Sequence, residues 1–245
     1  VGPQHAPRGP ARQLAAGRSA AGTLHPVQPV VVGGRAPGRH IHDLVLHYIE
    51  LFDQLGLTAD VNLVGFSLGG LIAARFAIEQ KHRLRRLVLV APAGLRVPGV
   101  AVDDLFRIPP EELPGRLVHR MDTLLPYPPS DPGDVDFTVD RYREIRTTAI
   151  MLWEQPYDRV LPRWLGRVDI PTLVVWGDED RLLPVDLAEG WAALLPRCTV
   201  AHFPDAGHLV LDHVGEPEGV QGMGGVVGRR RPHHERAAGL VGGCL

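Results

Sequence analysis

A glycine-flanked serine joins an apolar strand pattern to a helical pattern within residues 61–70. The residues read V-N-L-V-G-F-S-L-G-G, so Ser67 stands at the centre of a G-x-S-x-G motif. This motif predicts a sharp strand-to-helix turn, because side chains at Gly65 and Gly69 would collide where the two elements meet. The turn lifts Ser67 clear of the sheet. We therefore expect a reactive serine, with the backbone N–H of Leu68 facing a developing oxyanion. An ordinary glycine-rich turn is the alternative interpretation.

The apolar pattern on both sides of this turn predicts an α/β core. Apolar residues at i, i+3 and i+4 spacing indicate a helix over 41–55. Residues 87–91 are continuously apolar, which is typical of a parallel strand covered on both faces. The further elements that we expect are a helix over 68–77, strands over 172–176 and 199–203, and a helix from 184 to about 195. A strand over 30–32, before Gly33-Gly34, is a weaker expectation.

The middle of the chain has a different character. Prolines crowd between residues 109 and 132, and helical patterns lie near 111–125 and 139–153. We expect a helical insertion between two strands of the sheet. One interpretation is a set of connecting helices. The other is a lid over the serine that supplies an apolar pocket, which we favour because long loops inside compact domains usually have a function.

A serine hydroxyl needs a base to take its proton and an acid to hold that base. His208 lies in the turn P-D-A-G-H just after a predicted strand, where catalytic groups project from a parallel sheet. Another loop that follows a strand, W-G-D-E-D-R-L-L-P, offers three carboxylates, those of Asp178, Glu179 and Asp180. The order serine, acid, histidine is one of the known orders of a catalytic triad.

With these three motifs in order, the chain resembles the α/β-hydrolase fold superfamily over about residues 41–212. The resemblance implies a mostly parallel sheet with helices on both faces and a helical cap. It also implies that the acid is Asp180 rather than Asp178, and that the catalytic residues are Ser67, Asp180 and His208. The strand-to-helix turn that carries Ser67 is called the nucleophile elbow. The epoxide hydrolases and haloalkane dehalogenases of this fold have aspartate at this position instead of serine. No cofactor is implied.

Alternatives to these assignments remain at the acid and at the base. Asp178 and Glu179 are expected to be solvated loop charges, although either is a candidate acid. His202 falls inside a predicted strand and is expected to be a packed or surface residue. His213 stands where relatives often have glutamate, and we interpret it as a departure rather than a second base.

Both flanks depart from the family pattern. Residues 1–42 hold five arginines and no acidic residue, and 219–245 hold four arginines and one glutamate. Neither flank contains Phe, Trp or Tyr, so both are expected to be irregular. The family's H-G loop, which supplies a second oxyanion donor, is not found in residues 1–40. Arginine makes up 25 of the 26 basic residues, and we hypothesise that the flanks are translated out of frame from GC-rich DNA.

The expected organisation follows from these observations. The units are an unmatched segment over 1–40, a core over 41–95 with the elbow, a cap over 96–165, a core over 166–212 with the acid and histidine loops, and an unmatched tail over 213–245. Because the missing early strands would leave a sheet edge open, we expect a weakened or poorly folded product.

Composition narrows the class of function. A net charge of −2 in 245 residues argues against a nucleic-acid or membrane-surface protein. There is no apolar run of 18 residues and no signal-peptide pattern. Cys198 and Cys244 form no disulfide or metal-ligand pattern. We expect a cytoplasmic protein that acts on a small molecule without metal or cofactor, and the oligomeric state stays open.

The function that these motifs predict is hydrolysis of an ester, or of a small carbonyl or C–C substrate, by a serine nucleophile. The alternative, from a different class, is a truncated non-catalytic relative or a ligand-binding protein that keeps the pocket.

Overall fold

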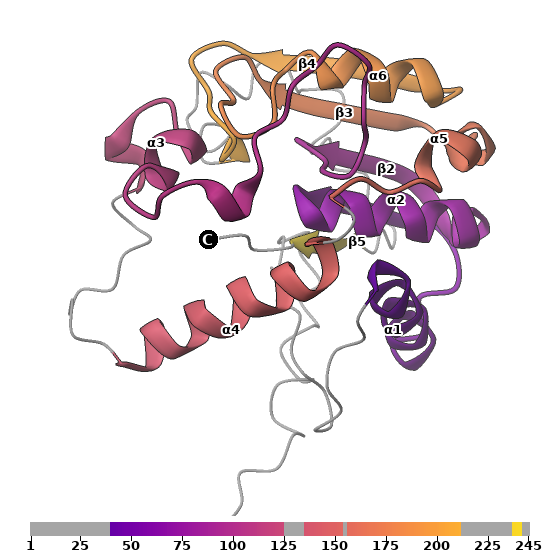
Figure 1. Cartoon of the computed structure of the whole chain (residues 1–245). Helices are drawn as coiled ribbons and strands as arrows, with labels where there is room; N and C mark the ends of the chain where they lie inside the picture. Colours follow the sequence, from indigo (N-terminus) through magenta and orange to yellow (C-terminus); the bar gives the residue numbers. More distant parts are fainter. Residues whose placement is uncertain (1–39, 125–134, 154–155, 212–236, 242–245) are drawn as a thin grey trace, which may run out of the picture.

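Within the residues that the structure describes, five short strands form one parallel β-sheet. The computed structural model describes residues 40–124, 135–153, 156–211 and 237–241. The strands lie in the order β4-β3-β2-β1-β5, and every neighbouring pair is parallel (Figure 1). Their bounds are Val61–Phe66 for β1, Leu84–Val90 for β2, Thr172–Gly177 for β3, Cys198–Phe203 for β4 and Ala237–Val241 for β5. The first four correspond to the predicted apolar segments, whereas 30–32 lies outside the described residues.

Among the described residues, three helices belong to this core, and they confirm the helical patterns in the sequence. Helix α1 covers Ile41–Gln54, α2 covers Leu68–Gln80 and α6 covers Leu187–Leu194. The first turn of α1 is stabilised by Asp43, whose carboxylate accepts a hydrogen bond from the His40 N–H at 3.0 Å. A short 3₁₀ turn, η4 at Lys81–Arg83, links α2 to β2.

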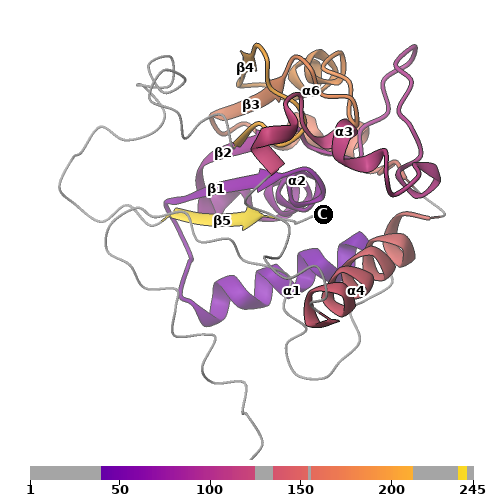
Figure 2. The ribbon, with the colours of Figure 1, turned by 90° about the vertical axis from the view of Figure 1, so that its left-hand side faces the viewer.

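One face of the sheet holds the main core. Helix α2 packs against β1 and β2, and α6 packs against β3 and β4 (Figure 2). The side chains on this face stand in register across the strands, so that Leu63 pairs with Leu87, and Leu89 with Val174. All four are fully buried. Burial of such residues supplies about 1.5–3 kcal/mol each, which makes this layer the main stabilising contact of the fold.

The opposite face of the sheet is less covered at its centre than at the carboxyl ends of its strands, where Phe66, Val90 and Val175 are buried. Its central row runs through Val64, Val88 and Leu173, which are register partners on β1, β2 and β3. Each is only partly buried. Continuous apolar strands predict helices on both faces, but α2 and α6 both lie on the same side of the sheet (Figure 2). The helices expected on the second face do not fall within the described residues.

Strand β5 departs from the expected organisation. It lies in the Gly- and Arg-rich tail, for which the sequence pattern indicated no regular structure. Residues Ala237–Val241 pair in parallel with Asn62–Phe66 and cover the edge of β1. The sheet edge that we expected to be open at β1 is therefore paired with a segment from the other end of the chain.

The segment between β2 and β3 is mostly helical. Its bounds are Leu105–Arg107 for η5, Leu113–Leu117 for α3, Met121–Leu124 for η6, Val135–Leu152 for α4, Leu161–Trp164 for α5 and Leu165–Arg167 for η7. Helix α3 is much shorter than the helix predicted over 111–125, whereas α4 begins four residues before the pattern at 139–153. No helix within the described ranges is both long and apolar enough to cross a bilayer.

Candidate functional site

Ser67 occupies a strained backbone position between β1 and α2. Its φ and ψ are 50° and −118°, a region that non-glycine residues rarely adopt. Hydrogen bonds from both sides hold it there. The Ser67 N–H donates to the Val90 carbonyl at 2.9 Å, and the Ser67 carbonyl accepts from the Ala93 N–H at 3.0 Å. The end of β2 thus fixes the turn, and strain at such a position is typical of functional sites.

The glycine before the serine allows this turn to form. A Cβ atom at Gly65 would collide with the carbonyl oxygen of Gly69 and lie 2.6 Å from the Cβ of Ala73. Strand β1 and helix α2 therefore approach more closely than any side chain at Gly65 permits. This close approach is the geometry that the G-x-S-x-G motif predicts.

His208 lies between Ser67 and Asp180. Its Nε2 is 3.0 Å from the Ser67 Oγ, and its Nδ1 is 2.8 Å from the Asp180 Oδ2. All three side chains are buried, with His208 at 0% exposure. The other carboxylate oxygen, Asp180 Oδ1, accepts hydrogen bonds from the N–H groups of Leu182 and Leu183 at 2.9 and 2.8 Å. Both carboxylate oxygens are therefore held, and the orientation of Asp180 toward the imidazole is fixed.

Close backbone contacts join the acid loop to the histidine turn. The Glu179 N–H donates to the Ala206 carbonyl at 2.9 Å. A Cβ atom at Gly177 would collide with that same carbonyl oxygen. On the other side, the Leu209 N–H donates to the Leu117 carbonyl at 2.9 Å. These contacts hold the histidine turn against the end of β3 and against α3.

Side-chain packing adds to this arrangement on the serine side. The ring of Phe66, which precedes the serine, lies 5.0 Å from the His208 ring between centroids. We expected no role for Phe66 from the sequence, although its place next to Ser67 was a usable signal.

The other carboxylates of the acid loop lie elsewhere. Asp178 Oδ1 is 3.0 Å from His202 Nδ1, and both side chains are about 40% exposed. Glu179 Oε2 is 3.8 Å from His119 Nδ1, and the two side chains are 46% and 29% exposed. Neither acid contacts His208, whereas Asp180 does. His213 lies outside the described residues.

The first backbone N–H of α2, that of Leu68, is available beside Ser67. Within the described residues, no group accepts a hydrogen bond from it. Leu68 and Ser67 also line the same cavity. An unpaired N–H at a helix N-terminus is suited to a negative charge next to it.

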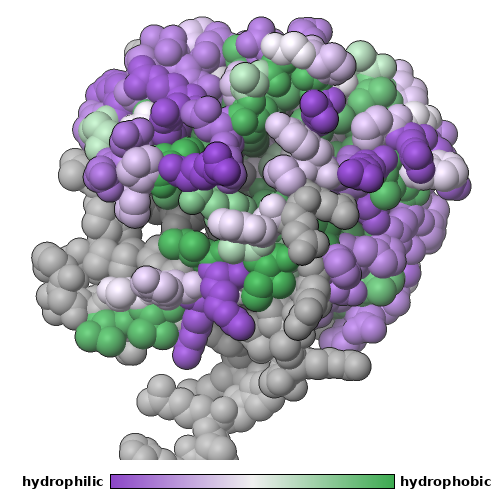
Figure 3. All heavy atoms as spheres, in the orientation of Figure 1, coloured by the Kyte–Doolittle hydropathy of each residue, from purple (hydrophilic) through white to green (hydrophobic). Residues whose placement is uncertain are grey.

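A cavity of about 220 Å³ opens beside Ser67. Its walls come from the segment after β2, from residues 102–106, from the end of α4 with residues 156–157, and from the acid loop with the start of α6. Figure 3 shows a hollow between α4 and the segment that carries α3, bordered by hydrophobic and hydrophilic residues. We expected an apolar pocket from this part of the chain, but no sequence pattern singled out the lining residues.

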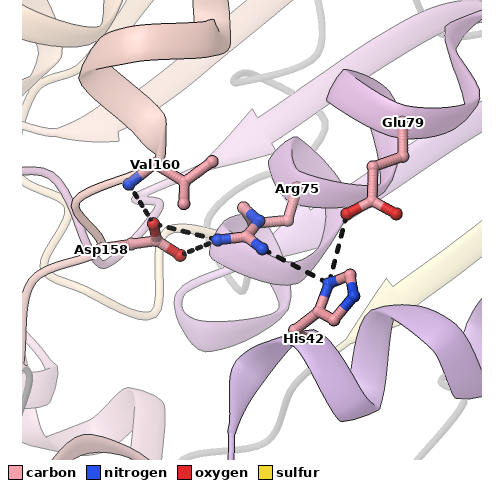
Figure 4. A network of polar contacts seen from close by, with 5 residues as sticks. All are labelled: His42, Arg75, Glu79, Asp158 and Val160. Atoms are coloured by element: carbon pink, nitrogen blue, oxygen red, sulfur yellow. Dashed lines mark hydrogen bonds and ion pairs between the residues drawn. The ribbon is translucent and has the colours of Figure 1, made fainter.

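A buried ion pair fixes one wall of this cavity to the elbow helix. Arg75 of α2 contacts both carboxylate oxygens of Asp158, at 2.9 and 3.2 Å (Figure 4). Asp158 also accepts from the Val160 N–H at 2.7 Å, and its own N–H donates to the Gly94 carbonyl at 2.8 Å. His42 of α1 lies 3.4 Å from the Arg75 guanidinium at the outer end of this network. No sequence pattern indicated the pair, because 83 residues separate its members.

The described residues contain no group of three or more His, Cys, Asp or Glu side chains that could hold a metal ion. Of the two cysteines, Cys198 is a free thiol, and burial raises its pKa. The geometry around Ser67 thus comprises a hydroxyl, an imidazole, a carboxylate, a free backbone N–H and a small cavity. This set is sufficient for acyl transfer through a serine.

Comparison with known proteins agrees with this geometry. A model of the alpha/beta hydrolase family matches residues 7–220. The match therefore begins well before the elbow, within the N-terminal segment that the motifs did not assign.

The known proteins and solved structures that are similar to this chain include a lipase and two other hydrolases. Lipase 3 of Moraxella sp. (strain TA144) is 26% identical over 178 residues, which cover 65% of this chain and 54% of the lipase. A 2-hydroxy-6-oxononadienedioate/2-hydroxy-6-oxononatrienedioate hydrolase of Comamonas testosteroni is 29% identical over 173 residues, which cover 64% and 59%. The structure of a 2-hydroxy-6-oxo-6-phenylhexa-2,4-dienoate hydrolase from Rhodococcus sp. strain RHA1 has a TM-score of 0.57 at 20% identity, with 77% of this chain and 72% of that one covered. The chain spans little more than half the length of the two sequence relatives.

Proposed function

The chain belongs to the alpha/beta hydrolase family, and on this basis we propose that it is a serine hydrolase whose nucleophile is Ser67. The observation that supports the proposal is the chain of hydrogen bonds from Ser67 Oγ through His208 to Asp180. A strained, buried serine next to an imidazole that a carboxylate orients is the arrangement that activates a hydroxyl. The proposed catalytic residues are Ser67, His208 and Asp180.

The proposed reaction proceeds in two halves. His208 Nε2 takes the proton of the Ser67 hydroxyl as its oxygen attacks the substrate carbonyl, and it then gives that proton to the leaving group. Asp180 holds the Nδ1–H tautomer and stabilises the imidazolium. The Leu68 N–H donates to the oxyanion of the tetrahedral intermediate. Water, activated by His208, attacks the acyl-enzyme in the second half and frees the acid.

We propose an ester as the substrate, and a ketone cleaved at a C–C bond as the second candidate. The names of the relatives support both, since one is a lipase and two others are hydrolases of oxo-dienoates. Residues 96–165 would act as the cap that sets substrate choice, because residues 102–106 and the end of α4 line the cavity. The proposal includes a small-molecule substrate, a cytoplasmic location and no cofactor.

Hydrolysis of p-nitrophenyl butyrate tests the proposal. Ser67→Ala should lower kcat/KM at least about 10³-fold, because removing a nucleophile disables the whole catalytic unit. The circular dichroism spectrum of this variant should match that of the parent protein. Lys81→Gln, which lies far from the cavity, serves as the control and should leave kcat/KM unchanged after the same expression and purification. A non-catalytic ligand-binding protein would instead give the same low rate with and without Ser67, and that result would refute the assignment.

A further inference from the structure

The charged residues that line the cavity beside Ser67 are all acidic. Among the described lining residues, Asp103 and Asp104 carry charge, and no lysine, arginine or histidine is present. The remaining lining residues are mostly apolar, such as Leu95, Val102 and Leu187.

Each of the two aspartates has an arginine partner that does not line the cavity. Asp103 Oδ2 is 2.6 Å from Arg116 Nη1, and Asp104 Oδ2 is 3.5 Å from Arg107 Nε. Both aspartate side chains are 53% exposed, and Arg107 is 87% exposed. Such hydrated pairs neutralise one another only in part.

The neighbouring arginines do not add a positive charge to the lining of the cavity. Arg116 also faces Glu112 at 3.8 Å, so its positive charge is shared between two carboxylates. Arg96 lies 5.7 Å over the ring of Tyr157, a lining residue, but Arg96 itself is not among the lining residues. These arginines thus lie outside the lining, to which Asp103 and Asp104 belong, so an incoming carboxylate meets like charge and no described cation among the lining residues.

We propose that this cavity selects an uncharged acyl group and rejects one that carries a carboxylate, with Asp103 and Asp104 as the residues that determine this selectivity. The inference rests on the proposed function and narrows its substrate class to neutral esters. A carboxylate that enters an apolar site without a cation loses its hydration and gains no partner. Like charges at the wall oppose its entry further. A neutral alkyl chain meets neither cost and gains from apolar burial.

Two esters of equal chain length and the same leaving group test the selectivity. p-Nitrophenyl pentanoate is neutral, and mono-p-nitrophenyl glutarate differs by a terminal carboxylate. We expect kcat/KM for the pentanoate to exceed that for the glutarate by about tenfold or more, as unpaired charge and like-charge contact both act against the glutarate. The preference should shrink as ionic strength rises, because salt screens exposed charges.

Charge-removing variants assign the effect to the two aspartates. The double variant Asp103→Asn/Asp104→Asn should narrow the ratio by about three- to tenfold, the factor expected for hydrated charges at contact distance. Asp169→Asn removes the same type of charge on the Lys81 side of the molecule and should leave the ratio unchanged. Equal kcat/KM for the two esters in the parent protein would overturn the inference, and so would a ratio that neither salt nor the double variant changes.

Ligand-observed NMR with Ser67→Ala separates this inference from the proposed function. Methyl pentanoate and monomethyl glutarate serve as ligands, since binding requires no turnover. If the parent protein hydrolyses neither aryl ester, the proposed function fails, and the selectivity is then decided by binding alone. Stronger saturation transfer to methyl pentanoate supports the inference, whereas equal or stronger transfer to monomethyl glutarate overturns it.

Discussion

Removal of Asp158 from the ion pair with Arg75 should destabilise the fold strongly. The two side chains are only 8% and 11% exposed, and Arg75 contacts both carboxylate oxygens (Figure 4). Asp158→Ala leaves the guanidinium buried without its counter-charge. Breaking a buried pair in this way typically costs about 3–5 kcal/mol of unfolding free energy. Because a domain is stable by only about 5–15 kcal/mol, this loss is a large part of the total.

A surface ion pair in the same chain provides the matched control. Lys81 and Asp169 lie 3.0 Å apart, with side chains 39% and 63% exposed. Asp169→Ala should cost far less than Asp158→Ala, because water screens and replaces an exposed pair. Both variants remove an aspartate that contacts one basic residue, so the comparison tests burial together with the hydrogen bond that Asp158 accepts from the Val160 N–H.

Urea-induced unfolding, followed by circular dichroism, measures both variants. A second variant, Arg75→Met/Asp158→Leu, replaces the pair by apolar groups and should recover most of the stability, because no unpaired charge remains. The reasoning is refuted if Asp158→Ala costs no more than Asp169→Ala. It is also refuted if the double replacement is less stable than Asp158→Ala alone.

Three further changes test other parts of the account. Gly65→Ala should lower the unfolding free energy by about 1–3 kcal/mol, since the added methyl overlaps the facing helix backbone; thermal melting that stays unchanged would contradict this. Asp180→Asn should lower kcat for an aryl ester by up to about 10⁴-fold, whereas Asp178→Asn should change it little, because only Asp180 orients the imidazole; reversed effects would show the acid assignment to be wrong. Burial raises the pKa of Tyr48 to about 12, above the unfolded value near 10. Stability from this group is therefore complete below pH 10 and falls by about 2–3 kcal/mol as pH rises to 12, because only the unfolded chain releases its proton there. Tyr48→Phe should flatten this decline in alkaline urea titrations, and exposed Tyr142→Phe should not.

Local patterns in the sequence predicted much of the core and the candidate site. Each candidate residue had a signal of its own: Ser67 in a glycine-flanked turn, and Asp180 and His208 in loops just after apolar strands. Their contacts join residues 141 and 28 positions apart. These residues meet because the carboxyl ends of parallel strands lie along one edge of the sheet. Their distances follow from the packing of the loops, which no local pattern specifies.

The shortness of α3 shows how tertiary contacts override a helical pattern. The pattern over 111–125 predicts one helix, but α3 ends at Leu117, and Val118 is extended, with φ −124° and ψ 148°. The Leu117 carbonyl accepts a hydrogen bond from the Leu209 N–H beside the candidate base. That carbonyl therefore bonds to the histidine turn and not to a further turn of helix, and α3 ends at Leu117.

Strand β5 was missed for a related reason. Its residues, A-A-G-L-V, have little strand propensity and no alternation of apolar and polar side chains. Its pairing is with the edge of β1, opposite Asn62–Phe66. The unpaired backbone groups of β1 provide the hydrogen-bonding partners. A local sequence pattern does not reveal such partners, because they lie far away in the chain. The hypothesis that both flanks are translated out of frame stays a prediction, which the coding DNA tests.

Covalent labelling by a fluorophosphonate tests the central claim, that Ser67 is an activated nucleophile. The chain has only three serines, Ser19, Ser67 and Ser130, so peptide mass spectrometry identifies the labelled one without ambiguity. We predict one label per chain, at Ser67, with labelling greatly slowed in His208→Ala while its circular dichroism spectrum is retained. A folded protein that takes up no label, or that is labelled at Ser19 or Ser130 instead, would contradict the account.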